Sequence, residues 1–196
     1  ISDEIHCDMA LFGNKHIPFA SVSPEAAACS ITFGSPSKTF NIAGIVSSYA
    51  IVPDKDLRER FFSWLEASEL NAAPLFSPIA TIAAFKHGEE WRRQMIEYVE
   101  GNIEFIEEYC RKYMPQIRPV RPQASFLVWL DCTGLDMLHD ELIDLFVNKA
   151  GLALNDGEMF NPGGEGFMRL NIGTPRDILK EAMKKLLDAV STIQTK

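Results

Sequence analysis

The sequence predicts an α/β protein with a second, smaller α+β domain toward its C-terminus. Two kinds of pattern predict this fold class. Residues 29–33 and 42–52 are rich in β-branched and aromatic types without helical spacing, which is typical of buried strands. Elsewhere, apolar residues recur at three- and four-residue steps, which is typical of amphipathic helices. We expect residues 1–85 to form the first, α/β domain, 86–114 a long connecting helix and 115–196 the small α+β domain.

The two predicted strands flank the loop Gly34-Ser35-Pro36-Ser37-Lys38, and Pro53-Asp54 follows the second of them. Helices and strands then continue to the end of the chain, and Pro119 and Pro122 mark a connector into the small domain. The expected elements are helices near residues 57–65, from residue 77, and over 95–113, 140–150 and 178–190, strands at 125–130 and 167–172, and a glycine-rich loop at 161–166.

Composition and charge exclude several classes of protein. The 196 residues are 46% hydrophobic and 23% charged, which is typical of a folded globular chain. The net charge of −8, without any long basic run, argues against a nucleic-acid partner. No apolar stretch approaches the roughly 20 residues that span a bilayer, and no signal peptide is recognisable, so we expect a cytoplasmic protein without a membrane partner. The four cysteines form no CxxC pair, which predicts neither a disulfide framework nor a zinc knuckle.

Lys38 is the first candidate for chemistry. A lysine forms a Schiff base usefully when its amine is neutral part of the time, which requires a partly dry pocket or a nearby positive charge. Asp3 and His6 follow a predicted strand end, the edge where open α/β sheets place their ligands, and a carboxylate there can bind a pyridinium nitrogen. From position alone, three ordinary interpretations stay open: Lys38 as a surface charge, Asp3 as a turn cap and His6 as an unremarkable polar residue.

Three ordered motifs carry a resemblance to a known family. They are Ser2-Asp3-Glu4-Ile5-His6, Gly34-Ser35-Pro36-Ser37-Lys38-Thr39-Phe40-Asn41-Ile42-Ala43-Gly44 and Gly166-Phe167-Met168-Arg169-Leu170-Asn171-Ile172-Gly173. Nearly the whole chain resembles class I/II aminotransferases and their relatives, most closely the PatB/MalY-type cystathionine β-lyases, or C–S lyases. The resemblance implies a fold-type I enzyme using pyridoxal 5′-phosphate (PLP). The chain would comprise the C-terminal part of the PLP-dependent transferase (aspartate aminotransferase-like) major domain, followed by the small C-terminal domain.

The resemblance also implies a role for each residue of the first two motifs. Asp3 would pair with the pyridine nitrogen of PLP and keep it protonated, and His6 would lie near the phenolic oxygen of the cofactor. Ser35 and Ser37 match positions that bind the cofactor phosphate. Lys38 matches the lysine that holds PLP as a Schiff base and then, once free, removes the α-proton of the substrate.

The third motif and one departure bear on the substrate. Arg169 matches the residue that binds the α-carboxylate of an amino acid, a task suited to a planar and permanently charged side chain. Many aminotransferases carry a phosphate-binding arginine eight residues after the lysine, where this chain has Val46. That departure favours the lyase branch, as does His6, where many aminotransferases have Tyr.

We therefore expect the parent enzyme to catalyse β-elimination from cystathionine or cysteine-like L-amino acids, which yields pyruvate, ammonia and a thiol. Amino transfer to a 2-keto acid is the alternative, and the same residues would serve both outcomes, so the sequence does not decide between them. The resemblance further implies a homodimer in which the second subunit contributes to the active site.

Two other kinds of site stay open on the sequence alone. The run Ser35-Pro36-Ser37-Lys38 satisfies the S-x-x-K pattern of acyl-transferring enzymes, although the companion triplets of that pattern are missing. A mixed set of zinc ligand atoms occurs near the N-terminus, but its spacing matches no closed zinc site. That set consists of Asp3, His6, Cys7, Asp8 and His16.

A third hypothesis is that the chain is a folded, non-catalytic fragment that does not hold PLP alone. The sequence begins at Ile1 without an initiator Met, and Ile1 has the character of the last residue of a strand. We therefore expect a fragment of a longer protein, with further strands of the cofactor domain outside the sequence.

Overall fold

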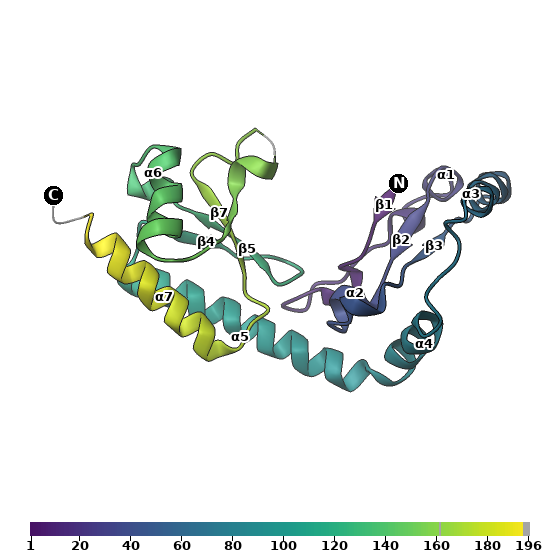
Figure 1. Cartoon of the computed structure of the whole chain (residues 1–196), viewed down its shortest axis with the longest axis horizontal. Helices are drawn as coiled ribbons and strands as arrows, with labels where there is room; N and C mark the ends of the chain where they lie inside the picture. The colour runs from purple at the N-terminus through teal and green to yellow at the C-terminus, as the bar shows by residue number, and fades with distance from the viewer. Residues whose placement is uncertain (161, 194–196) are drawn as a thin grey trace. The chain divides into compact units, whose positions relative to one another are not determined.

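The computed structural model describes residues 1–160 and 162–193, which belong to two compact units, Ile1–Ile96 and Glu97–Lys196 (Figure 1). The division falls inside the long helix α5 (Glu89–Tyr113), which therefore contributes to both units. Most of the fully buried apolar side chains belong to the second unit. Within the described residues, no helix is both long and apolar enough to cross a membrane.

The first unit is built on a three-stranded sheet of order β1-β2-β3. β1 runs parallel to β2, so the carboxyl ends of these two strands meet at one edge of the sheet, whereas β3 is antiparallel to β2. The elements of this unit are β1 Ser2–Asp3, α1 Pro24–Ala28, β2 Thr32–Gly34, α2 Pro36–Thr39, β3 Tyr49–Ile51, α3 Lys55–Ala67, α4 Ser77–His87 and the start of α5, with 3-10 helices at Cys7–Met9, Phe19–Ser21 and Ala43–Ile45.

Local chemistry explains where several of these helices begin. The carboxylate of Asp54 accepts a hydrogen bond of 2.8 Å from the Leu57 backbone N–H, so Asp54 caps α3. Ser77 and Pro78 lie in the first turn of α4. Proline is tolerated there because the backbone N–H that it lacks would have no acceptor within the helix. The helices expected near residues 57–65 and from residue 77 are confirmed.

The strand expected over residues 42–52 is largely wrong. Only Tyr49–Ile51 is a strand, while Ala43–Ile45 forms a 3-10 turn and Val46 is left-handed with φ 52°. A β-branched residue in that conformation interrupts any extended run. Ser77 Oγ donates a hydrogen bond of 2.5 Å to the Ile45 carbonyl, so α4 holds this irregular segment. The apolar composition of the segment thus reflects packing around a turn.

The preceding segment also differs from its expected form. The strand expected at residues 29–33 is displaced to Thr32–Gly34, and the expected loop after it contains the short helix α2. Ser35 has an extended backbone, and its side chain caps α2 by accepting from the Ser37 N–H at 3.1 Å. Pro36 at the first helical position favours this turn, a signal that sequence reasoning overlooked.

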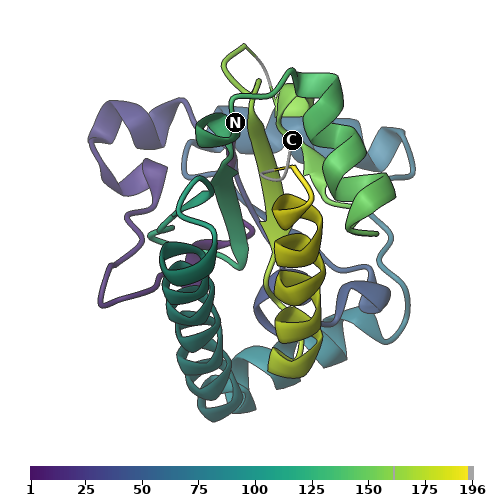
Figure 2. The same ribbon diagram turned by 90° about the vertical axis from the view of Figure 1, so that its left-hand side faces the viewer.

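The second unit contains a four-stranded antiparallel sheet of order β4-β5-β7-β6. Its helices α5 and α7 run side by side along one face of this sheet in both views (Figures 1 and 2). The elements are the remainder of α5, β4 Arg118–Val120, β5 Leu127–Asp131, α6 His139–Asp144, a π-helical turn Leu145–Lys149, β6 Asn155–Asp156, β7 Phe167–Asn171 and α7 Arg176–Ser191, with 3-10 helices at Thr133–Leu135 and Gly157–Phe160.

Alternation along β5 and β7 divides the sheet into two faces. Val128 and Leu130 of β5 and Met168 and Leu170 of β7 are buried, which places the core on the face that the helices cover. Intervening residues such as Trp129 and Arg169 lie on the opposite face, which is only partly covered. Arg169, the residue predicted to bind the substrate, therefore lies on this second face.

The connector expected around Pro119 and Pro122 is partly wrong, because Arg118–Val120 pairs with β5 as strand β4. β4 is an edge strand, and an edge strand tolerates a proline that cannot donate to a partner. The two-residue strand β6 was also missed, being too short for an alternation signal. The strands and helices expected at 125–130, 140–150, 167–172 and 178–190 are confirmed within two residues at their ends, with the second of them divided into α6 and the π-helical turn. In the expected loop 161–166, Asn161 lies outside the described residues.

Candidate active site

The carboxyl edge of β1 and β2 gathers the candidate residues of the first unit. Asp3 is paired in register with Phe33, and Ser35 follows two residues beyond Phe33, so the two polar residues leave the sheet at the same edge. The Asp3 carboxylate is exposed and accepts one hydrogen bond of 3.2 Å from the Ile5 backbone N–H. Asp3 therefore presents an anion at the place where a sheet of this kind binds ligands.

The two candidate serines differ in what surrounds them. Ser35 is 6% exposed, and its hydroxyl donates to the Ser47 carbonyl at 2.5 Å. The Ser35 and Ser37 hydroxyl oxygens are 2.8 Å apart, and Ser37 is partly exposed. Because Ser37 is partly exposed and Ser35 is buried, the Ser37 hydroxyl is the more accessible of the two to a ligand.

Lys38 projects from the last turn of α2 and is exposed. No hydrogen bond or ion pair ties its ammonium to the described part of the chain, including Ser35, so an activated S-x-x-K serine is not formed here. The next residues anchor the helix instead. Thr39 is fully buried with its hydroxyl 3.5 Å from Asp8, and the Phe40 ring packs edge-on against Phe85 of α4 at 5.4 Å. The Lys38 side chain is thus exposed on a helical turn whose following residues are packed.

A chain of hydroxyl groups joins α4 to the segment that carries the lysine. Ser47 Oγ lies 2.7 Å from Thr81 Oγ1, and the Thr81 hydroxyl is also 2.7 Å from the Ser77 carbonyl. The Ser35 hydroxyl donates to the carbonyl of Ser47. Hydrogen bonds therefore connect helix α4, the loop after α2 and the residue that caps α2. We call Ser35, Ser47, Ser77 and Thr81 the hydroxyl network.

His6 follows β1 directly and is partly buried, with its backbone carbonyl accepting from Met9 N at 3.0 Å. The structure places it three residues beyond Asp3, where β1 ends. Its role near a cofactor oxygen stays a prediction.

Glu4 organises the segment after β1. Its carboxylate is 8% exposed and accepts from His16 Nε2 at 2.7 Å and from the Phe19 N–H at 2.9 Å, while Ser2 Oγ lies at 3.0 Å. Burial alone would raise the pKa of Glu4, but the hydrogen bonds from His16, Phe19 and Ser2 outweigh burial and hold the pKa below its ordinary value.

Glu4 and Asp8 also line a cavity of about 580 Å³ beside Tyr49 and Arg92. Cys7 lies in its wall, and burial together with the neighbouring Asp8 raises the pKa of the Cys7 thiol to about 11. A thiol with that pKa is a poor nucleophile at neutral pH. Among the residues described, the five N-terminal residues considered for zinc do not gather into a ligand cluster.

Arg169 lies in the second unit, on the open face of the sheet. Its guanidinium donates to Asn155 Oδ1 of β6 at 3.0 Å and lies 4.1 Å from the centre of the Phe160 ring. Phe160 in turn meets Trp129 edge-on at 5.4 Å, beside an apolar pocket of about 340 Å³. The atom Nε of Arg169 is buried without a hydrogen-bond partner among the described residues. Asn155 and Phe160, which hold Arg169, carried no sequence signal.

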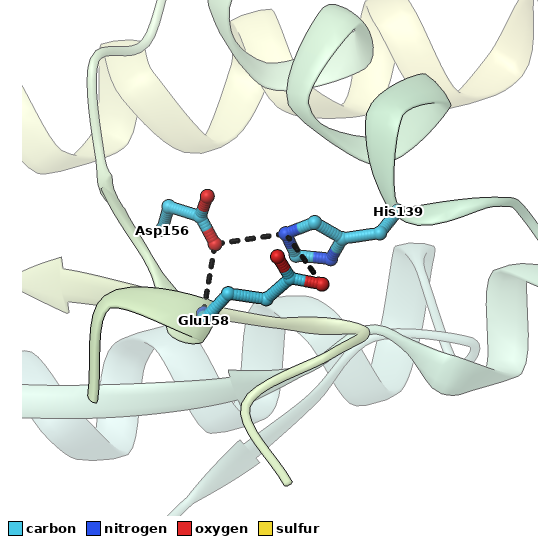
Figure 3. Close-up of side chains that lie close together, drawn as sticks. All are labelled: His139, Asp156 and Glu158. Atoms are coloured by element: carbon cyan, nitrogen blue, oxygen red, sulfur yellow. Dashed lines mark hydrogen bonds and ion pairs between the residues drawn. The ribbon is translucent and has the colours of Figure 1, made fainter. Parts of the chain in front are cut away.

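One further group of side chains was not predicted. His139, Asp156 and Glu158 place possible ligand atoms within 4.8 Å of one another (Figure 3). Their spacing in sequence, 17 and 2 residues, matches no motif. The fold brings them together by placing the start of α6 beside β6 and the 3-10 helix that follows it.

Known proteins resemble this chain over nearly all of its length. It is 38% identical over 191 residues to the cystathionine β-lyase PatB of Bacillus subtilis and 30% identical over 195 residues to the protein MalY of Escherichia coli, which covers 97% and 99% of the chain. It is also 26% identical over 193 residues to an aspartate aminotransferase of Pyrococcus horikoshii. No family model matches the chain.

Solved structures give the same result. Cystalysin of Treponema denticola, which contains pyridoxal 5′-phosphate, superposes with a TM-score of 0.93 at 30% identity over 97% of the chain. A PLP-bound C–S lyase of Staphylococcus hominis superposes with a TM-score of 0.82 at 31% identity over 96% of the chain. The chain spans about half the length of these relatives, 48–49%. Its homologues are thus PatB/MalY-type lyases and aminotransferases, and the fold is that of fold-type I PLP enzymes, as the sequence predicted.

Proposed function

Because its homologues include lyases that hold PLP, we propose that the whole protein is a PLP-dependent C–S β-lyase. It would act on cystathionine or cysteine-like amino acids and yield pyruvate, ammonia and a thiol. The observation that supports this proposal is that Asp3 ends β1, while Ser37 and Lys38 follow the end of the parallel strand β2. An acid, a hydroxyl and an amine that follow the same edge of the sheet match the three polar parts of PLP, namely its ring nitrogen, phosphate and aldehyde.

The residues of the chain fit this cofactor chemically. The exposed carboxylate of Asp3 has capacity for a second hydrogen bond and would keep a pyridine nitrogen protonated. Ser37 would donate to the phosphate, with Ser35 holding it in place. Val46, at the position where many aminotransferases have a phosphate-binding arginine, is 68% exposed and supplies no charge. His6 would lie beside the phenolic oxygen.

Bound PLP supplies an electron sink for the bond that breaks at the α-carbon of the substrate. Lys38 supplies the amine that first holds the cofactor and then accepts the α-proton, and its exposure on a fixed helical turn leaves the amine able to reach both. Arg169 would orient the substrate by its carboxylate, since a planar guanidinium binds a carboxylate through two parallel hydrogen bonds. Asn155 and Phe160 would keep that guanidinium in one orientation.

The test uses the full-length protein with L-cystathionine and measures pyruvate without an added keto acid. We expect pyruvate to form, the Lys38→Ala variant to lose both activity and the visible absorbance of bound PLP, and Lys55→Ala to behave as wild type. Lys55 is a suitable control because it is an exposed lysine of α3 whose ammonium lies 3.7 Å from the exposed carboxylate of Glu59. Formation of pyruvate by Lys38→Ala at the wild-type rate would contradict the proposal.

Amino transfer to a 2-keto acid is the second candidate function. The similarity to an aspartate aminotransferase supports it, and every residue named above serves it equally. Keto-acid-dependent amino transfer in the absence of pyruvate formation would replace the lyase assignment by this one.

We further propose that the 196-residue chain alone binds PLP weakly and is inactive, and that the whole enzyme is a homodimer. The chain spans about half of its relatives, and the sheet of the first unit has three strands. Borohydride-sensitive absorbance of PLP on the 196-residue chain would contradict the first of these statements. The cytoplasmic location expected from the sequence stays a prediction.

A further inference from the structure

His139 links α6 to β6 and to the turn before β7 through its two ring nitrogens, and Figure 3 shows the contact with Asp156. The residue is the first of α6, and its side chain is 9% exposed. Nε2 lies 2.8 Å from Asp156 Oδ1 in β6, and the backbone N–H of Gly166 donates to Nδ1 at 3.1 Å, just before β7. Both nitrogens of a nearly buried imidazole are therefore used.

These two contacts determine the tautomer. Because Gly166 N–H is a donor, Nδ1 must carry a lone pair, and the proton of the neutral ring lies on Nε2, where it is donated to Asp156. Glu158 Oε1, 4.0 Å from Nε2, completes a set with metal-ligand spacing. A metal would require a lone pair on Nε2 as well, so this arrangement opposes a metal ion and favours a structural hydrogen-bond bridge.

The bridge fixes both strands that hold Arg169. Asp156 is adjacent to Asn155, whose side chain accepts from Arg169, and Asn155 is paired with Arg169 in register. Gly166, held at its backbone by His139, is left-handed with φ 79° and begins the turn into β7. A loss of the bridge would release the ends of β6 and β7 on either side of the Asn155–Arg169 pair.

We propose that His139 is a positioning residue for the substrate carboxylate, acting on Arg169 through Asp156, Asn155 and Gly166. This inference rests on the proposed function, in which Arg169 binds that carboxylate. The imidazole touches neither the guanidinium nor a ligand. It holds the strand pair in the register that presents the guanidinium to a carboxylate, and misplacement of such a group by about 1 Å is costly.

The test uses the full-length holoenzyme and four variants. His139→Ala removes both bonds, His139→Gln keeps a donor toward Asp156, His139→Asn keeps an acceptor for Gly166, and His87→Ala is the control, because His87 is an exposed histidine of α4. The KM and kcat for an amino-acid substrate are measured beside the inhibition constant of the corresponding amine without its carboxylate.

We expect His139→Ala to raise KM by about tenfold with a smaller change in kcat, and the Gln and Asn variants to give smaller increases. The inhibition constant of the carboxylate-free amine and the PLP absorbance should stay unchanged. A purely structural role would instead lower the unfolding temperature and leave KM alone. Unchanged KM in all folded His139 variants, or an equal loss of affinity for the amine, would overturn the proposal.

Two further measurements separate this inference from the proposed function. Arg169→Ala should raise KM more than any His139 variant. If Arg169→Ala does not change KM, Arg169 does not bind the substrate carboxylate and the proposed function loses that residue. If Arg169→Ala raises KM but the His139 variants do not, only the role of His139 is wrong. Ring-nitrogen NMR shifts of the neutral ring should report protonated Nε2 and unprotonated Nδ1, unchanged by added Zn²⁺. The opposite tautomer, or shifts that move with Zn²⁺, would overturn the inference.

Discussion

Ser35 and Ser37 are two residues apart, yet their surroundings assign them different tasks. Ser35→Ala removes the cap of α2 and the bond to Ser47, so we expect it to lower the free energy of unfolding by about 1 kcal/mol. Ser37→Ala should leave stability nearly unchanged but weaken PLP binding by the full-length protein by about tenfold, through the loss of one hydrogen bond to a charged group. Thermal unfolding and PLP titration measure the two effects.

The exposed Ser48 supplies the control, since Ser48→Ala should change neither quantity. Equal effects of Ser35→Ala and Ser37→Ala on PLP affinity would show that the two hydroxyls both contact the phosphate.

The sequence predicted Asp3, Lys38 and Arg169 because each lies in an ordered motif whose residue types suit one chemical task. It did not predict Asn155, Phe160 or His139. These residues act through contacts between residues that lie 9 to 27 positions apart along the chain. A pattern in sequence identifies a group that reacts, whereas the groups that position it depend on strand pairing.

At the scale of elements, two glycines set the closest approach in the turns around β6 and β7. A Cβ on Gly164 would overlap the carbonyl of Gly157, and a Cβ on Gly157 would overlap the carbonyl of Gly164. Since both obstacles are backbone, we expect Gly164→Ala to destabilise the protein by about 1–3 kcal/mol. Denaturant unfolding should show no such loss for Gly44→Ala, because an added Cβ there meets nothing within 4 Å. Equal stability of the two variants would contradict the close approach.

The segment between β1 and α1 gives a pH dependence. The pKa of Glu4 is lowered in the folded protein, so its contribution to stability is present above the ordinary glutamate pKa of 4.5 and is lost as the pH falls through the folded-state value. We expect Glu4→Gln to be less stable than wild type at neutral pH and the difference to shrink progressively below about pH 4.5. Thermal unfolding measured across this pH range checks it.

Glu66→Gln is the matched control, since Glu66 is an exposed glutamate of α3. Its stability should follow the wild type at every pH. A Glu4→Gln difference that persists unchanged at low pH would mean that the ionised carboxylate is not what stabilises the segment.

Elements with strong periodicity were predicted more accurately than elements shaped by contacts. The buried stripe of α5, with Val99, Ile103, Ile106 and Cys110, repeats at helical spacing and was found from that spacing. The turn around Val46 was mistaken for strand because its residue types are those of strands, and only the hydrogen bond from Ser77 shows why it is a turn. Hydrophobic periodicity predicts which face of a regular helix or strand is buried, but it does not predict irregular backbone conformations.

At the scale of the whole molecule, the first unit leaves a set of large apolar side chains exposed around α4. These are Leu70, Leu75, Phe76, Ile79 and Ile82, with exposed fractions of 62%, 80%, 71%, 67% and 65%. Single exposed apolar residues are ordinary, but five within thirteen positions are typical of a surface that another chain or domain covers. α4 also carries Thr81, which contacts Ser47 in the hydroxyl network. Because Ser47 contacts Ser35, the cap of α2, this surface is connected to the helix that carries Lys38.

If the whole enzyme is a homodimer that uses this surface, a charge placed there should separate the subunits. We expect Ile79→Glu and Ile82→Glu in the full-length protein to shift sedimentation from dimer toward monomer and to lower PLP affinity, because burying an unpaired carboxylate costs several kcal/mol. Lys86→Glu, on the same helix at a position that already carries a charge, should sediment as wild type. Variants that stay dimeric but become less stable would indicate that another part of the same chain covers α4. The subunit contact proposed for this surface would then be wrong.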